Sequence, residues 1–544
     1  MKKLITLFVS VFFVSAFLYA QKLPLIKSTR FKIDTTNIIK FGAKADGLTL
    51  NTKSINAAIE SCSKKGGGVV VIPTGFWLTG PIVLKSNVNL HIQRGALLQF
   101  TKDYNEYALI ETNWEGVPAV RNQSPISATN ATNIAITGSG IIDGNGDVWR
   151  AVKKDKLSES QWKKLISGGG VLSEDKRIWY PTESSFKGSK VSKAGVMTEG
   201  KGIADYLEIK DFLRPNLLVF TKCDLILLEG VTFQNSPAWC LHPLMSSNIT
   251  VKGITVKNPW YAQNGDGIDV ESCKNVLIEN SVFDVGDDGL CMKSGRDAEG
   301  RKRAMPTQDV IIRNCTVYNA HGGFVIGSEM SGGAKNIFVS NCTFVGSDIG
   351  LRFKTTRGRG GVVENIYIDN IVMKNIPGEA ILFDMYYAAQ DPVALAGEKR
   401  EAPKVVFVPV SEATPQFKNI FIKNVVCDGA EKAIFIRGLP EMNIHDIHLE
   451  NINIISKKGM ECSEAKNISL KNVKFVTENS NPVIDILNSS NIIFTKFSTE
   501  MNPSLMIRMG GDRTNNIQWI NSTKLTNSQY LTEFGAAENS LQIK

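Results

Sequence analysis

A short pattern of alternating apolar and polar residues recurs through most of the chain. It starts with Asn or Asp and often ends with Asn, as in NVLIENSVF at 275, NIFVSNCTF at 336 and NISLKNVKF at 467. Successive copies begin 21 to 34 residues apart, except for one interval of 54 residues between the copies at 365 and 419. Alternation with a period of two, rich in Val, Ile and Phe, predicts strands. A repeat of this length indicates stacked supersecondary units.

The repeated strands predict an all-β chain folded as a parallel β-helix. No helical pattern of about 10 to 15 residues separates them, as a βαβ fold would require, and the Leu-dominated signature of leucine-rich repeats is absent. A β-sandwich would not keep one period for so many units. We expect the recurring Asn to form ladders of stacked side chains in the turns. The long interval indicates either one degenerate coil or an insertion.

The chain outside the repeats predicts a cap and two insertions. Residues 52–63 carry apolar side chains at helical spacing, and this short helix would cover the open N-terminal end of the solenoid. Residues near 151–210 and near 385–416 break the period of the repeat. We therefore expect a single β-helix domain over residues 21–544, with both segments as insertions in it.

The N-terminus has the pattern of a secretory signal peptide over residues 1–20. Lys2 and Lys3 form a basic start, and one apolar run extends from Leu4 to Ala20. An anchor that stays in the membrane is the alternative, but the run is short for a membrane span. We expect export, to the periplasm or out of the cell. No later stretch is long and apolar enough to span a bilayer, so we expect no stable membrane insertion.

Composition and charge exclude several classes of protein. The chain of 544 residues is 43% hydrophobic and 21% charged, which excludes a disordered chain and a multi-span membrane protein. Its formal net charge of +9 is not gathered in a dense Lys/Arg stripe, so we expect no nucleic-acid partner, while an acidic partner is permitted. The nine Cys include no CxxC pair. Because several share one position in the repeat, we expect free thiols in the core rather than disulfides or zinc ligands.

Four polar clusters lie on successive units of the repeat. They occupy residues 264–269, 286–289, 321–323 and 352–354. Asp287 and His321 each come 12 residues after the start of their copy of the repeat, so they share one phase of the coil. Adjacent coils lie about 4.8 Å apart. We therefore expect all four clusters to form one polar strip on an outer face.

Three carboxylates in one cleft suit the hydrolysis of a glycosidic bond. Asp266, Asp287 and Asp288 would supply them, and the flanking glycines allow the bend that two adjacent Asp need to reach one cleft. One carboxyl group has to stay protonated to donate to the leaving oxygen, and like charges close by favour that proton. Arg352 and Lys354 lie two residues apart, so on a strand both point outward and offer cations to a substrate carboxylate.

These residues also have structural interpretations. Each cluster alone would more often be a solvated turn or strand face, whereas four clusters in one phase favour a site. His321 could tune the acid or bind a hydroxyl group. No Gly-x-Ser-x-Gly elbow for a nucleophilic serine is present. No metal site is indicated, although carboxylates alone bind calcium weakly.

At these clusters the sequence resembles glycoside hydrolase family 28, the polygalacturonases. The family signature is Asn-Thr-Asp, Gly-Asp-Asp, Gly-His-Gly and Arg-Ile-Lys, and this chain has NGD at 264–266, GDD at 286–288, AHG at 320–322 and RFK at 352–354. The departures at Gly265, Ala320 and Phe353 remove no side chain of a catalytic type. Segments such as NSPAW and GSGIIDGNG also look like family segments, and the resemblance spans roughly residues 38–500.

The resemblance implies a right-handed parallel β-helix and an inverting hydrolase that uses no metal and no other cofactor. The catalytic residues that it implies are the general acid Asp287, the water-holding Asp266 and Asp288, and His321 in support of the acid. The substrate-binding residues that it implies are Arg352 and Lys354 for a galacturonate carboxylate, Tyr387 with Tyr386 as the alternative, and His242 and Asn264 as further contacts.

Chemistry and resemblance together predict hydrolysis of α-1,4 galacturonosidic bonds in pectin. The partner would be an acidic polysaccharide or oligosaccharide that contains galacturonate. The two insertions could wall off one end of the cleft, which favours action from a chain end. Three alternatives are a galacturonohydrolase of the same family directed at rhamnogalacturonan, a pectate lyase on the same architecture, and a non-catalytic β-helix that binds polysaccharide.

Overall fold

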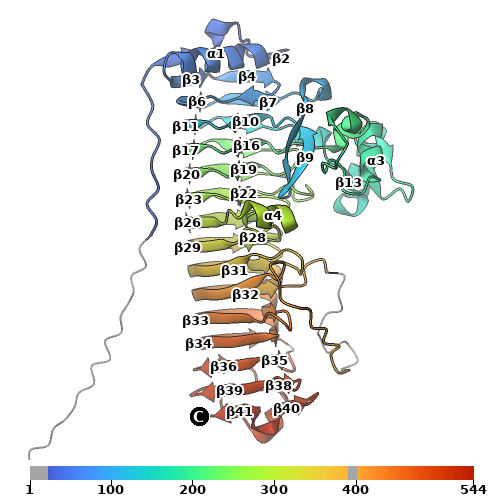
Figure 1. The fold of residues 1–544 in the computed structure, drawn as a ribbon, viewed down its shortest axis with the longest axis vertical. Coiled ribbons are helices and arrows are strands. Elements are labelled where there is room, and N and C mark those ends of the chain that lie inside the picture. Colours follow the sequence, from blue (N-terminus) through green and yellow to red (C-terminus); the bar gives the residue numbers. More distant parts are fainter. Residues whose placement is uncertain (1–22, 390–400, 479) are drawn as a thin grey trace, which may run out of the picture.

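The computed structural model describes residues 23–389, 401–478 and 480–544. Its parallel strands stack coil upon coil into one elongated right-handed β-helix (Figure 1). Strands alternate inward apolar and outward polar side chains, as a period of two requires, and the inward ones form one continuous core. The all-β prediction is therefore confirmed. The expected signal peptide at residues 1–20 lies outside the described residues.

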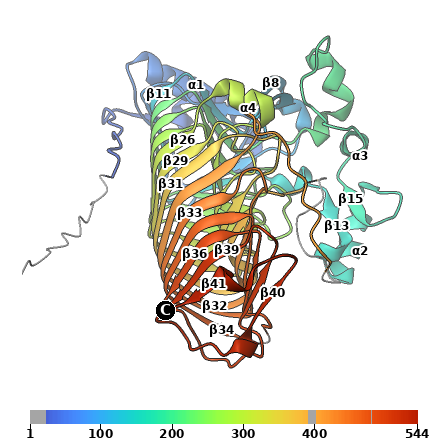
Figure 2. The same cartoon turned by 60° about the horizontal axis from the view of Figure 1, so that its bottom comes forward.

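Strands of successive coils pair in three columns, which we call faces A, B and C (Figure 2). Face A contains β5 (Ile82–Val83), β10 (Ile126–Thr129), β16 (Leu218–Thr221), β19 (Leu241–Leu244), β22 (Ile268–Glu271), β25 (Asp288–Lys293), β28 (Gly322–Ile326), β30 (Leu351–Lys354), β35 (Ile484–Leu487), β38 (Ile507–Gly510) and β40 (Tyr530–Glu533). Face B contains β1 (Thr35–Asn37), β3 (Gly68–Ile72), β6 (Val88–Ile92), β11 (Thr132–Gly138), β17 (Asp224–Glu229), β20 (Ser247–Lys252), β23 (Lys274–Glu279), β26 (Thr307–Arg313), β36 (Ser490–Thr495), β39 (Asn515–Ile520) and β41 (Leu541–Ile543).

The third column and the longest strands complete the coils. Face C contains β2 (Asp46–Leu50), β4 (Gly75–Thr79), β7 (Ala96–Phe100), β12 (Ile141–Asp143), β18 (Thr232–Gln234), β21 (Thr255–Lys257), β24 (Val282–Asp284), β27 (Thr316–Tyr318) and β37 (Ser498–Thr499). Five long strands bend through more than one face: β29 (Ala334–Val345), β31 (Val362–Asp384), β32 (Gln416–Arg437), β33 (Ile444–Ser463) and β34 (Ala465–Thr477).

Stacked isoleucines fix the register of face B. The same inward position on successive coils is filled by Ile337, Ile366, Ile420, Ile447, Ile468, Ile492 and Ile517. Each of these side chains is at most 1% exposed. A slip of one residue would turn the whole set to the solvent. Burial therefore holds the coils in register, and side chains on the outer surface inherit that register.

Two ladders of Asn side chains explain the polar ends of the repeat. Asn275 near the start of β23 and Asn280 directly after its end have φ of 57° and 52°, a left-handed conformation that Asn tolerates better than most residues. Equivalent Asn or Asp residues on other coils are joined by side-chain hydrogen bonds, for example 2.8 Å from Asn370 to Asn341. The expected Asn ladders are confirmed, and they account for the two Asn five residues apart in several copies of the repeat.

The structure contains the predicted N-terminal cap and an insertion in the long interval of the repeat. Helix α1 (Thr52–Lys64) covers the N-terminal end of the solenoid (Figure 1) and buries Ile55 and Ile59 against the first coils. Strand β31 pairs directly with β32, so the interval of 54 residues contains an insertion and no extra coil. Part of that insertion, residues 390–400, lies outside the described residues.

The first insertion projects from the side of the helix, on the right in Figure 1. It contains β13 (Val152–Lys153), α2 (Glu159–Ser167), β14 (Val171–Leu172), β15 (Ile178–Tyr180), α3 (Glu183–Ser189) and the 3-10 segment η5 (Ile203–Phe212). It packs against a hairpin that the repeat pattern did not predict, formed by β8 (Leu109–Trp114) and β9 (Val117–Asn122). The backbone N–H of Val120 donates to the carbonyl of Gly195 at 2.7 Å. A short helix, α4 (Asp297–Arg303), follows β25.

The expectation about the cysteines is also met. All nine Cys are buried and unpaired, as expected for small core residues of a repeat. Within the described part of the chain, no helix combines the length and the apolar character needed to cross a membrane.

Replacing Gly323 with Ala should destabilise the fold. An added Cβ would lie 2.4 Å from the ring of Phe344 in the core, and overpacking of this kind costs about 1–3 kcal/mol. Denaturant unfolding measures the loss. Gly202→Ala is the matched control, because nothing lies within 4 Å of its added Cβ. Equal stability of the two variants would contradict the close packing at Gly323.

Candidate active site

A row of inward-facing glycines brings acidic residues to the outer side of face A. An added Cβ would lie 2.5 Å from a core or backbone atom at Gly267 and at Gly289. In both coils the next residue, Ile268 or Leu290, also faces the core. Two inward residues in succession break the alternation, so the residue before each glycine turns outward. Those residues are Asp266 and Asp288, and they are neighbours because the N–H of Gly267 donates to the carbonyl of Asp288 at 2.9 Å.

Asp287 joins these two carboxyl groups through a bend at Gly286. A Cβ on Gly286 would lie 2.3 Å from the carbonyl oxygen of Pro259, so only glycine fits this turn. The Asp287 carboxylate accepts hydrogen bonds from the backbone N–H of Asn264 at 3.2 Å and of Asp288 at 3.0 Å. One carboxylate oxygen from each of the three Asp lies within 4.8 Å of the others. The structure thus brings together the three carboxyl groups that the sequence singled out.

Two cations from another coil hold Asp288. Its oxygens lie 2.6 Å from Nζ of Lys354 and 3.2 Å from Nη1 of Arg352. Asp288 is 1% exposed, and burial alone would raise its pKa. Attraction to Lys354 and Arg352 outweighs burial and holds the pKa of Asp288 below its usual value. Asp288 is therefore the carboxylate that stays ionised.

Asp266 has the opposite electrostatic environment. It is 2% exposed, and its Oδ1 has no hydrogen-bond partner in the described protein. Burial, followed by the negative charges of Asp269 and Asp287, raises the pKa of Asp266 well above its usual value. The cluster therefore contains one carboxyl group that favours its proton beside one that favours its charge, which is the separation that acid–base chemistry needs.

His321 contacts the third carboxylate from the next coil. Its Nδ1 lies 3.3 Å from Oδ1 of Asp287, and its Nε2 lies 3.8 Å from Asp348. The contact with Asp287 raises the pKa of His321 despite partial burial of the ring. The imidazolium form is thus favoured beside Asp287, and the side chain is 41% exposed, within reach of a ligand.

A buried charge cluster that the sequence analysis missed lies under the site. Nζ of Lys293 is 3.0 Å from Glu329 and 3.5 Å from Asp269. Both carboxylate oxygens of Asp269 are buried without a hydrogen-bond partner, and burial raises its pKa to about 8. Burial opposes ionisation of Glu329, yet Lys293 and Arg359 lower its pKa to about 2. In the pairing register, Lys293 lies in the same outward row as Lys354. That register was the signal from which the buried charge cluster could have been predicted.

The remaining candidate site residues differ in how deeply their side chains are buried. The ring centroid of Tyr387 lies 5.0 Å from Nζ of Lys354, whereas Tyr386 is 4% exposed and packs with the core. The side chain of Asn264 accepts a hydrogen bond from Arg214 at 2.9 Å. His242 is 1% exposed, and its Nε2 lies 2.8 Å from Glu271. The structure therefore puts Tyr387 beside the cations and His242 within a buried polar pair.

Comparison with known proteins agrees with this geometry. Residues 195–474, just over half of the chain, match the family model described as glycosyl hydrolases family 28. The chain belongs to this family. It is therefore a glycoside hydrolase, and the predicted resemblance to this family is confirmed.

Related proteins of the family include both exo- and endo-acting enzymes. An exo-poly-alpha-D-galacturonosidase from Dickeya chrysanthemi is 27% identical over 462 residues, covering 80% of this chain and 71% of that protein. An endo-polygalacturonase from Pectobacterium carotovorum is 26% identical over 439 residues, covering 79% and 89%. The crystal structure of a hyperthermoactive exopolygalacturonase from Thermotoga maritima is 31% identical, with a TM-score of 0.61 and coverage of 86% and 93%.

Removing the cation of Lys354 should destabilise the protein, because the Asp288 carboxylate is buried. We expect Lys354→Met to lower the free energy of unfolding by about 3–5 kcal/mol at pH 7, because the carboxylate loses its main partner. Asp288 has a lowered folded pKa, so its stabilisation is present above the unfolded pKa and is lost as pH falls. The deficit of the variant should therefore shrink at pH 4, where Asp288 can be protonated.

Denaturant unfolding at the two pH values tests this expectation. Lys374→Met is the matched control, since Lys374 pairs with Asp428 at 2.8 Å on the exposed surface, where an ion pair contributes less than about 1 kcal/mol. A pH-independent deficit of Lys354→Met would contradict the assignment of Asp288 as its ionised partner.

The contact between His321 and Asp287 should be visible in a histidine titration. With only five His in the chain, the imidazole signals can be followed individually by NMR. We expect His321 to titrate above the ordinary value of 6.5 and to return toward it in Asp287→Asn, which removes the negative charge. Asp348→Asn is the control and should shift the midpoint less, because Asp348 lies farther away. Equal shifts in both variants would contradict the pairing.

Proposed function

We propose that this protein is a polygalacturonase that hydrolyses α-1,4 galacturonosidic bonds in pectin from a chain end. The observation that carries the proposal is the acidic cluster of Asp266, Asp287 and Asp288 beside the cations Arg352 and Lys354. Carboxyl groups of unequal proton affinity suit glycoside hydrolysis, and the cations suit a substrate that carries a carboxylate on each sugar. The names of the related proteins support the same substrate class.

We assign the general-acid role to Asp287. Its side chain is 20% exposed, against 2% for Asp288, so it can reach the leaving oxygen of a bound chain. The imidazolium of His321 beside it would favour return of a proton after each turnover. Asp288 stays ionised next to Lys354, and Asp266 lies behind it. Asp288 would hold and deprotonate the attacking water, and Asp266, which favours its proton, would help to hold that water by a hydrogen bond.

Arg352 and Tyr387 are the groups that we assign to the substrate carboxylate. The side chain of Arg352 is 15% exposed, and its hydrogen bonds to Asp288 and to the carbonyl of His321 both come from Nη1, so Nη2 can donate to a substrate carboxylate. The ring of Tyr387 lies 5.6 Å from Cζ of Arg352 and borders the same space. Lys354 is already bound to Asp288 and would act on the substrate mainly by its charge.

The inverting outcome rests on the family resemblance. The three carboxyl groups lie within 4.8 Å of one another by their nearest oxygens, whereas inverting glycosidases usually separate two carboxyl groups by about 6.5–9.5 Å. Here two carboxyl groups together hold the water, in place of one distant base. NMR of the first product formed, before mutarotation, distinguishes inversion from retention of the anomeric configuration.

Action from a chain end is supported by the position of the first insertion. The segment from β13 to η5 and the hairpin β8–β9 stand beside the acidic cluster on its N-terminal side, where Val196 bridges to Ala119. They would restrict that end of the outer face, so we expect a bound chain to extend toward later coils. We also propose a single catalytic domain over residues 21–544 and export of the protein, on the N-terminal pattern and on the polymeric nature of pectin.

Product analysis on polygalacturonate tests the proposed function. We expect saturated galacturonate from the start of the reaction, unaffected by EDTA, and a loss of at least about 100-fold in kcat for Asp287→Asn. A mixed ladder of oligomers would contradict action from the chain end. An unsaturated product that absorbs in the ultraviolet would indicate a lyase. Cleavage of rhamnogalacturonan fragments in place of polygalacturonate would indicate a hydrolase directed at rhamnogalacturonan. Binding without turnover would indicate a non-catalytic protein.

A further inference from the structure

Lys293 is a buried cation beneath the acidic cluster to which the proposed mechanism gives no role. It is 5% exposed, and its Nζ lies 3.0 Å from Glu329 and 3.5 Å from Asp269. The ring of Trp239 covers the amine, with its centroid 4.7 Å from Nζ. Taking an ammonium group out of water is costly. A lysine that is held at this depth beside a reaction centre is therefore a candidate for a part in the reaction.

Acidic groups from several elements of the fold surround Lys293. Its own strand β25, the neighbouring coils and the hairpin β8–β9 all contribute. The charged and titratable groups that face it are Glu115, Asp266, Asp269, Asp288, Cys291, Glu329 and Lys354. Burial opposes the charge of Lys293, but the acidic groups among these outweigh burial and raise its pKa. Lys293 is therefore a cation at neutral pH.

The charge of Lys293 acts on the carboxyl groups of the site. Burial raises the pKa of Asp288, and Lys293 adds to the two contacting cations that lower it. Burial and the neighbouring carboxylates raise the pKa of Asp266, and Lys293 acts there in the opposite direction. Buried charges are screened less by salt and water than exposed ones, so this influence reaches the site without direct contact.

Glu329 is the counter-ion that balances Lys293. It is buried as well, yet Lys293 and Arg359 hold its pKa at about 2. The carboxyl group of Asp269 is sensitive to both charges. Burial raises the pKa of Asp269 to about 8, while Lys293 acts against burial and Glu329 acts with it. Neither oxygen of Asp269 has a hydrogen-bond partner among the described residues, so its ionisation depends on these charges.

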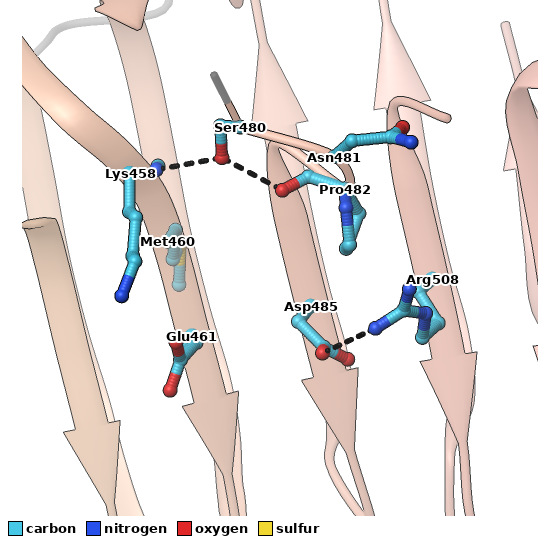
Figure 3. A pocket seen from close by; sticks show the side chains of 9 residues that line it. Lys458, Met460, Glu461, Ser480, Asn481, Pro482, Asp485 and Arg508 are labelled. Atoms are coloured by element: carbon cyan, nitrogen blue, oxygen red, sulfur yellow. Dashed lines mark hydrogen bonds and ion pairs between the residues drawn. The ribbon is translucent and has the colours of Figure 1, made fainter. Parts of the chain in front are cut away.

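A second pair of charges on face A lies in a different environment (Figure 3). The outward row of side chains that contains Asp269 continues, several coils later, to Asp485 and Arg508. Nη1 of Arg508 lies 3.2 Å from Asp485, and both side chains are partly exposed at the wall of a pocket. Water screens such a pair. Depth of burial therefore distinguishes Lys293 from a cation at the same face of the solenoid.

We propose that Lys293 and Glu329 are positioning residues for the hydrolytic reaction: the buried cation stabilises the ionised carboxylate that holds the water, and its counter-ion limits how strongly it does so. Neither side chain touches the reacting atoms in this assignment. Both act through the acidic cluster from the side away from the substrate. The inference deepens the proposed function and rests on it for the substrate of the kinetic test.

Removing either charge should move the pH profile of kcat/KM on polygalacturonate, in opposite directions. Lys293→Met removes a cation, so every carboxyl group of the cluster holds its proton more firmly. Both limbs of the profile should then move to higher pH by about 0.5–1 pH unit. Glu329→Gln removes an anion and should move both limbs to lower pH. KM should change little in either variant, because neither residue contacts the substrate.

A double variant separates charge from structure. Removing one partner of a buried ion pair leaves the other uncompensated and destabilises the protein, whereas removing both partners together is often nearly neutral. The profile of Lys293→Met/Glu329→Gln should therefore return toward that of the wild type, since the two shifts cancel. If Lys293→Met does not fold, Glu329→Gln and the double variant still provide the test.

A titration that needs no catalysis gives a second readout. Carbon-13 NMR of protein labelled at the aspartate carboxyl carbon follows Asp269, whose signal is assigned by its loss in Asp269→Asn. The midpoint, about 8 in the wild type, should rise in Lys293→Met and fall in Glu329→Gln. Lys293→Arg keeps the charge, so its midpoint should stay near that of the wild type even where activity is reduced.

Arg508→Met is the matched control, because it removes a cation of the same face far from the acidic cluster (Figure 3). It should leave the pH profile and the Asp269 midpoint unchanged. Shifts in the same direction for the two single variants, or no shift in either, would overturn the inference. If the Asp269 midpoint shifts as expected but the wild-type protein does not cleave polygalacturonate, the proposed function fails and the electrostatic assignment stands.

Discussion

The structure depends on one buried interaction, the pairing of Asp288 with Lys354 and Arg352. The partners are 66 and 64 residues apart in sequence and meet because their strands belong to the same face of a regular solenoid. Two cations outweigh the burial of one carboxylate and keep it charged. Asp266 has no cation in contact, and burial together with the charges of Asp269 and Asp287 leaves it as the group that favours a proton. The division of acid and base character in the cluster follows from that asymmetry.

Register is what makes this pairing reproducible. The core isoleucines prevent a coil from slipping, because a slip by one residue would expose them all. The inward glycines Gly267 and Gly289 then reverse the alternation in their two coils and turn Asp266 and Asp288 outward. Packing inside the solenoid and chemistry outside it are thus two consequences of the same coil geometry. The hairpin β8–β9 and the first insertion add what a regular coil lacks, a wall at one end of the outer face.

Periodicity made most of the fold and the central site predictable from sequence. A constant phase was enough to bring Asp287 near His321 and to turn Arg352 and Lys354 outward. Irregular parts lack such a phase, so the hairpin β8–β9 was not predicted. The ion-pair partners of individual side chains could not be predicted either. The sequence does not indicate that Lys354 binds Asp288 or that His242 is buried against Glu271.

A double-mutant cycle between Asp288 and Lys354 tests the central claim most directly. The free energies of unfolding of the wild-type protein, Asp288→Asn, Lys354→Met and the double variant would be measured at pH 7. A buried pair on which the site depends predicts a coupling energy above about 1.5 kcal/mol, within the range for residues in contact. A coupling below about 0.5 kcal/mol, typical of exposed ion pairs, would contradict the claim that this interaction organises the acidic cluster.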